Sequence, residues 1–285
     1  MKKTALLFAL ALIGLSVTAL EWPVTDFNPL RFFGQRSEGV IERGITVENA
    51  DIVRAAGHGR VLITLEQNGN MSGFPGTLGN AVILAHDDGL ITVYGNLGSL
   101  DRIGDTVQIE SQTILAQTGT AGWGKPHNFI FQVVDQLKKT ALNPLLLLPS
   151  LKDSRGPSIK NVIVVSRNNQ SSALGSVKAV RQGKYRLYAD VSDTIDGSSH
   201  ELSPFRISVL INGSEYSSVP FELLREEKGQ LFLSSPDYSW MNLYSDPSRL
   251  YLGEIALTRG RVDLSIIARD IAGNERSVMF GLQIE

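Results

Sequence analysis

The stretch from residue 79 to residue 149 decides the fold. It opens GNAVILAHDDGLITVYGNL (79–97), continues LDRIGDTVQIESQTILAQTGTAGWGKPHNFIFQVVD (100–135) and closes LNPLLLLP (142–149). Short apolar runs, namely AVILA, LITVYG, TVQIE, TILAQT and FIFQVV, alternate with the turn segments HDDG, IGD and GTAGWGKP. Runs of this length and composition predict consecutive antiparallel strands. The Gly and Asp residues between them suit tight turns.

The order of these pieces is more specific than their period. A GN-apolar-H-x-x-G-x-x-T-x-Y-x-x-L segment precedes a G-D-x-V segment, an I-L-x-x-T-G step, and then P-H and F-x-V. This order resembles the LytM/lysostaphin-type zinc peptidases of family M23, from about Glu42 to Pro149. The resemblance implies a β domain over residues 41–150 that carries a groove for cell-wall peptides.

The resemblance also implies a zinc site, and the sequence departs from it. In the family, an H-x-x-x-D motif and the second His of an H-x-H strand hold the metal. This gives the three protein ligands and open position that zinc hydrolysis needs. The first motif aligns with ERGIT, which places Glu42 at the His position and Thr46 at the Asp position. A neutral hydroxyl is a poor replacement for a carboxylate ligand.

The two histidines that assist the chemistry in the family are also affected. The family's Y-x-H-L segment matches YGNL, so Asn96 replaces a His with an amide that cannot exchange protons near neutral pH. The H-x-H strand can be aligned in two ways. Alignment on F-Q-V places Ile130 at the ligand position and Asn128 at the assisting position. Alignment on P-H keeps His127 as the assisting residue and places Phe129 at the ligand position, and a strand bulge permits either.

Under both alignments the third ligand is apolar, so only Glu42 can bind zinc. We therefore expect no metal or cofactor, with Asn96, His127 and Asn128 as remnants of a catalytic site. An alternative is a divergent zinc endopeptidase that recruits Glu42, His127 and an acidic residue such as Asp51; its cofactor would be zinc. His58 and His86 are expected to be structural turn and strand-end residues.

Composition excludes several function classes. The chain has 285 residues, 20% of them charged, and a net charge of −2. It therefore lacks the basic face of a nucleic-acid-binding protein. The absence of cysteine excludes disulfides and thiolate metal sites.

The N-terminus predicts export. MKK precedes the apolar run TALLFALALIGL, and Val17 and Ala19 suit a cut after Ala19, so residues 1–19 are predicted to be a signal peptide. The run is too short to span a bilayer, so no membrane span is expected after cleavage. The mature protein is expected in the periplasm or cell envelope. Residues 20–40 are predicted to form a lead-in segment whose aromatic residues pack on the first domain.

A second domain is predicted after a polar linker. Residues 151–158 (LKDSRGPS) lack an apolar run. From residue 159 to 285, seven or eight strand-like runs follow at the spacing of a β-sandwich, and ARDIAGNE resembles the closing hairpin of bacterial Ig-like domains. The expected fold class is all-β. The expected function is binding of peptidoglycan or regulation of a cell-wall amidase, and a second alternative is adhesion through the Ig-like domain.

Cleavage after Ala19 is directly testable. Because the n-region, the apolar run and the small residues stand in secretory order, N-terminal sequencing of protein exported by a bacterial host should begin at Leu20. Full-length protein beginning at Met1 in the envelope fraction would instead indicate an anchor.

Overall fold

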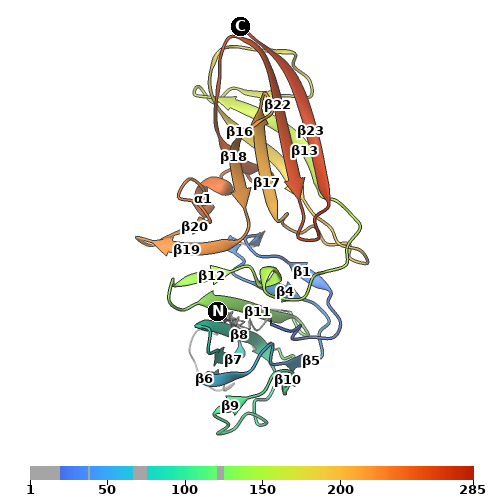
Figure 1. The fold of residues 1–285 in the computed structure, drawn as a ribbon, viewed down its shortest axis with the longest axis vertical. Coiled ribbons are helices and arrows are strands. Elements are labelled where there is room, and N and C mark those ends of the chain that lie inside the picture. The colour runs from blue at the N-terminus through green and yellow to red at the C-terminus, as the bar shows by residue number, and fades with distance from the viewer. Residues whose placement is uncertain (1–19, 38, 67–75, 121–124) are drawn as a thin grey trace, which may run out of the picture.

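The computed structural model describes residues 20–37, 39–66, 76–120 and 125–285 (Figure 1). The predicted signal peptide lies outside these residues. The described chain is all-β apart from the 3₁₀ helix η1 (Pro144–Leu146) and the single-turn helix α1 (Trp240–Leu243). The fold class is therefore as the sequence predicted.

An antiparallel sheet of ten strands forms the N-terminal half. Its main path runs β20-β19-β12-β11-β8-β7-β6-β9, and β4 joins β11 and carries β1. The strands are β1 (Pro29–Arg31), β4 (Ile45–Val47), β6 (Gly59–Leu65), β7 (Asn80–Ala85), β8 (Leu90–Leu97), β9 (Gln108–Ile109), β11 (Phe129–Asp135), β12 (Thr140–Leu142), β19 (Leu223–Glu227) and β20 (Gln230–Leu233). Two small sheets flank it, formed by β2 (Arg36–Ser37) with β3 (Val40–Ile41) and by β5 (Ile52–Arg54) with β10 (Ile114–Gln117).

The expected run of consecutive strand pairs is only partly correct. β7 and β8 pair as neighbours, but the next partner of β8 is β11. β9 pairs with β6, and β10 leaves the main sheet to pair with β5. β9 has two residues and β10 has four, so both are shorter than the apolar runs that predicted them.

The alternation of β11 builds the core of this half. Phe129, Phe131 and Val133 are fully buried, and the first two contact Tyr94 of β8 with ring centroids 6.4 and 5.3 Å apart. The Tyr94 hydroxyl accepts a hydrogen bond from the Ala56 N–H at 2.8 Å. The polar end of this buried ring is therefore satisfied.

The lead-in packs as predicted, although its aromatic residues serve both halves. Trp22 contacts Phe27 at a tilted angle, Phe27 stacks on Phe32, and all three pack on the N-terminal core. Phe33 instead belongs to the C-terminal core and is fully buried there.

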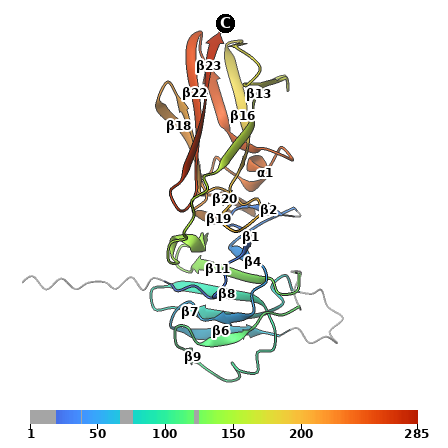
Figure 2. The same cartoon turned by 90° about the vertical axis from the view of Figure 1, so that its right-hand side faces the viewer.

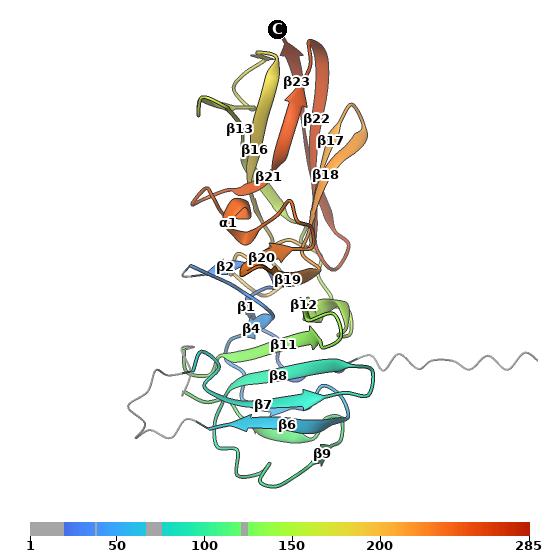
Figure 3. The same cartoon turned by 90° about the vertical axis from the view of Figure 1, so that its left-hand side faces the viewer.

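Two sheets pack face to face in the C-terminal half (Figures 2 and 3). One has the order β14-β13-β16-β21 and the other β15-β23-β22-β17-β18. Their strands are β13 (Ser158–Ser166), β14 (Ser171–Ala173), β15 (Ala179–Val180), β16 (Gly183–Ser192), β17 (Arg206–Ile211), β18 (Ser214–Pro220), β21 (Leu250–Leu257), β22 (Gly260–Arg269) and β23 (Glu275–Ile284).

Two of the strands expected in this sandwich lie elsewhere. β19 and β20 form a hairpin that extends the N-terminal sheet, because β19 pairs with β12 through Thr140–Arg225, Ala141–Leu224 and Leu142–Leu223. One sheet thus crosses the predicted linker. The boundaries 41–150 and 159–285 remain predictions, and so does the Ig-like nature of the sandwich.

The aromatic loop at residues 235–252 is packed. Tyr238 is 4% exposed and its hydroxyl donates to the Leu252 carbonyl at 3.3 Å. The Tyr244 hydroxyl donates to the Gly34 carbonyl at 2.6 Å, which ties the loop to the lead-in. These two hydroxyl contacts hold the loop against the sandwich and the lead-in.

Phe33 lies near the N-terminus of the chain but should stabilise the C-terminal half, because its side chain is buried in that core. Replacing a fully buried Phe with Ala typically costs about 3–5 kcal/mol, so Phe33→Ala should lower the urea midpoint of the C-terminal half. Leu137→Ala is the control, because this residue is 86% exposed and should change stability by less than about 0.5 kcal/mol. Equal midpoints for the two variants would contradict the packing described here.

Candidate functional site

Strand pairing brings two of the predicted site positions together. Ile130 of β11 pairs with Thr46 of β4 on one side and with Gly95 of β8 on the other. Residues directly opposite in antiparallel strands share a face of the sheet, so Ile130 and Thr46 lie on one face. Phe129 points to the other face and is fully buried among core aromatics.

Glu42 lies next to Thr46 through a tight local turn. The backbone at Gly44 passes so close to β11 that an added Cβ would lie 2.0 Å from the Phe131 carbonyl oxygen. Only Gly fits there, which explains the glycine in ERGIT. This path returns the Glu42 side chain to within hydrogen-bonding reach of the Thr46 side chain.

The Glu42 carboxyl is largely removed from solvent, with its side chain 13% exposed. Burial raises its pKa above the ordinary value of 4.5, while the Arg31 guanidinium and the Thr46 hydrogen bond oppose that change. Arg31 lies in β1, which pairs with β4, and its Nη1 is 3.9 Å from Glu42 Oε2. Arg31 could not be predicted as a partner of Glu42, because the lead-in shows no strand-like period.

Asn96 is a structural amide in this protein. It is fully buried with a φ of 57°, a left-handed conformation that Asn tolerates better than most residues. Its Nδ2 donates to the carbonyls of Asn128 at 2.6 Å and Lys125 at 3.2 Å. Asn96 therefore fastens the segment before β11 to the end of β8.

The remaining histidines do not join this group. His127 is exposed, and its carbonyl accepts a hydrogen bond from the Ala50 N–H. His58 is exposed and pairs with Glu110 at 3.2 Å. His86 contacts the His58 carbonyl at 2.7 Å and the Thr92 hydroxyl at 2.8 Å, as expected of a structural residue.

The ligand set of the enzyme alternative is not assembled. Among the residues that the structure describes, the grouping of three or more potential metal ligands is Asp153, Asp193 and Asp270, and it does not include Glu42, Asp51 or His127. Asp51 instead accepts a hydrogen bond from Gln117 at 3.3 Å.

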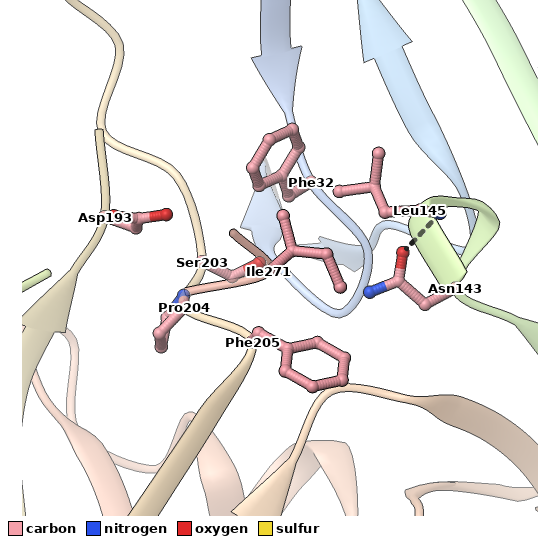
Figure 4. A pocket seen from close by; sticks show the side chains of 8 residues that line it. All are labelled: Phe32, Asn143, Leu145, Asp193, Ser203, Pro204, Phe205 and Ile271. Carbon is pink, nitrogen blue, oxygen red and sulfur yellow. Dashed lines mark hydrogen bonds between the residues drawn. The ribbon is translucent and has the colours of Figure 1, made fainter. Parts of the chain in front are cut away.

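The sequence also missed a contact between the halves. His200 Nε2 lies 2.8 Å from Oε1 of Glu48, which directly follows β4. A small cavity of about 10 Å³ occupies the same junction (Figure 4). It has room for about one water molecule. Its lining residues are Phe32, Asn143, Leu145, Asp193, Ser203, Pro204, Phe205 and Ile271.

The comparisons with known proteins agree with the domain suggested by the sequence. A family model described as Peptidase family M23 matches residues 41–144, and a second model without a description matches residues 156–285. An uncharacterized protein of Treponema pallidum (strain Nichols) is 39% identical over 124 residues, covering 40% of this chain and 84% of that protein.

Solved structures are similar at low identity. The catalytic domain of a mutant of the prophage-encoded M23 protein EnpA from Enterococcus faecalis is 18% identical, with a TM-score of 0.37 over 44% of this chain and 95% of that one. The SpoIIQ–SpoIIIAH pore-forming complex gives 18% identity and a TM-score of 0.35 over 45% of this chain and 90% of that one.

The raised pKa of Glu42 predicts a pH-dependent cost. A carboxyl whose pKa is higher in the folded state binds more protons folded than unfolded, so stability falls as pH rises through that pKa. Glu42→Gln removes this dependence. The free energy of unfolding of the variant, relative to that of wild type, should therefore increase as the pH is raised from about 4 to about 7. Urea unfolding at both pH values measures it, with the exposed Glu226→Gln as control. A constant difference between Glu42→Gln and wild type would contradict the assignment.

Proposed function

We propose that this chain, whose residues 41–144 match the model of peptidase family M23, is an exported, catalytically inactive protein that binds peptidoglycan or regulates a cell-wall hydrolase. Family M23 implies a cell-wall setting, and its members generally act outside the cytoplasm. The helices in the described part of the chain are all too short or too polar to span a bilayer.

The chemistry at the ligand positions carries this proposal. Of the positions that hold zinc in the family, Thr46 offers a neutral hydroxyl and Ile130 offers no ligand atom. Glu42 alone can bind a metal, and a single carboxylate cannot hold zinc in place of the three ligands of a catalytic site. We adopt the alignment that uses Ile130 because Phe129 is fully buried on the opposite face of the sheet.

The surroundings of Glu42 support the same conclusion. Arg31 supplies a positive charge beside the carboxylate, and Thr46 supplies a hydrogen bond to it. A divalent cation at this place would compete with the Arg31 guanidinium for the Glu42 carboxylate, and the two positive charges would repel each other. The positions of the assisting histidines, Asn96 and Asn128, hold amides, which cannot act as general acid or base near neutral pH.

A binding role fits what remains of the domain. The strands that form the sheet face at the family's substrate groove are present, and their register is fixed by a well-packed core. Groove and binding residues can outlast the loss of a metal, since they depend on the scaffold rather than on the ligands. Peptidoglycan, or a hydrolase that works on it, is the partner that this family setting favours.

The test measures metal content and hydrolysis together. The wild-type protein should carry no stoichiometric zinc by elemental analysis and should release no peptide from purified cell-wall sacculi. The triple variant Glu42→His, Thr46→Asp and Ile130→His should bind about one zinc per chain, because it rebuilds three ligands on one sheet face. The matched control replaces Ile130→His with Phe129→His, which directs the imidazole into the core and should bind none.

The binding role needs its own readout. Wild type should co-sediment with sacculi, or should raise the activity of a purified cell-wall amidase of the same envelope. Zinc at one per wild-type chain with turnover of cross-linked peptide would overturn the inactive assignment. Failure in both assays, with retention of the full-length protein on cell surfaces, would favour adhesion instead.

A further inference from the structure

Three aspartates from separate segments converge at the base of the C-terminal sandwich. Asp153 lies in the linker before β13, Asp193 directly follows β16, and Asp270 directly follows β22. One carboxylate oxygen from each lies within 4.8 Å of the others. Among the described residues, these three form a group of potential ligands close enough to share a metal ion.

Two of these carboxylates are almost completely buried. Asp193 is 2% exposed and Asp270 is 1% exposed. Like charges so close together repel each other strongly where solvent cannot screen them. Burial raises the pKa of Asp193 to about 7, and the charges of Asp270 and Asp153 add to the increase.

Local hydrogen bonds satisfy only part of the group. Both oxygens of Asp270 accept from Asn274, and Asp153 Oδ1 accepts from the N–H groups of Arg155 and Asp196. Asp193 Oδ1 and Asp153 Oδ2 are buried and have no hydrogen-bond partner in the part of the chain that the structure describes. Buried polar atoms without partners are rare and call for an explanation.

The nearby cation does not supply it. The Arg155 guanidinium donates to the Ser198 carbonyl at 2.6 Å and pairs with Asp196 at 3.7 Å. Its charge only partly lowers the pKa of Asp193. The cluster therefore keeps excess negative charge and two unused acceptor atoms that belong to different segments.

We propose that Asp153, Asp193 and Asp270 bind a calcium ion that fastens the 151–158 linker to the C-terminal sandwich. Ligand oxygens lie about 2.3–2.6 Å from calcium, so oxygens on one ion are up to about 5 Å apart, as in this cluster. An all-oxygen set of carboxylates suits calcium, whereas zinc prefers nitrogen and sulfur and magnesium requires near-ideal octahedral geometry.

The ion would complete a set of contacts that already orders the linker. The Asp153 carbonyl accepts from Asn274 Nδ2 at 3.0 Å, and the Ser154 N–H and hydroxyl both donate to Asp196. Each of these bonds joins the linker to a turn that follows a sandwich strand. Calcium would add the interaction that joins all three segments at one point.

The test uses the full-length chain after treatment with a chelator. Titration with calcium chloride, followed by calorimetry, should give about one ion per chain with a dissociation constant of about 0.1–1 mM, the range of extracellular calcium modules. Calcium should also raise the melting temperature and slow proteolysis within the linker. Magnesium chloride at equal concentration should have a clearly smaller effect.

Isosteric variants distinguish the site from general charge. Asp193→Asn and Asp270→Asn should each weaken calcium binding at least about tenfold and abolish the calcium-dependent melting shift. The control Asp190→Asn makes the same change of charge within β16, three residues before Asp193, and should bind calcium as wild type does. Absence of saturable binding by wild type up to about 10 mM calcium, ten times the weakest expected constant, would overturn the proposal. Undiminished calcium binding by Asp193→Asn would also overturn it. So would a melting temperature of Asp193→Asn above that of calcium-saturated wild type.

Discussion

The register of β11 against β4 and β8 is the constraint on which both the core and the site depend. Phe131 lies opposite Ile45 on one side and Tyr94 on the other, and all three are fully buried. A slip of one residue would turn Phe129 and Phe131 out of the core, so the register is strongly specified. The same alternation directs Ile130 to the face that carries Thr46. In the alignment proposed above, the core thereby leaves Ile130 at the third ligand position.

The inactive site proposed above is compatible with this core because the side chains of Asn96 and Glu42 have interaction partners within the protein. The Asn96 side chain donates to two backbone carbonyls, and the Asn96 backbone carbonyl accepts from the Gly119 N–H at 2.7 Å. Glu42 is held by Arg31 and Thr46. A zinc site would instead present unfilled lone pairs toward the metal. Asp193 Oδ1, which is buried and has no hydrogen-bond partner in the described chain, is an example of such an unfilled acceptor.

The sequence predicts elements better than it predicts their partners. The runs AVILA and LITVYG became β7 and β8, paired as expected, because their period and the HDDG turn are local information. The destinations of β9, β10 and β19 depend on strands far away in the chain, so the spacing of apolar runs could not give them. The positions Glu42, Thr46 and Asn96 were found through motif order. Arg31 was missed because a side-chain ion pair leaves no period in a sequence.

The same non-local pairing makes the two halves depend on each other. The ion pair of His200 with Glu48 is partly exposed and contributes little by itself. The pairing of β12 with β19 and the burial of Phe33 involve backbone bonds and a whole aromatic side chain, so these carry the junction. Both contacts fix the N-terminal sheet against the sandwich. Asp153, Asp193 and Asp270 lie at the base of the sandwich itself. A protein that binds through a groove without chemistry gains affinity by holding its surfaces in a fixed arrangement, because less freedom is lost on binding. For the binding role proposed above, the pairing of β12 with β19 and the burial of Phe33 would supply that fixed arrangement.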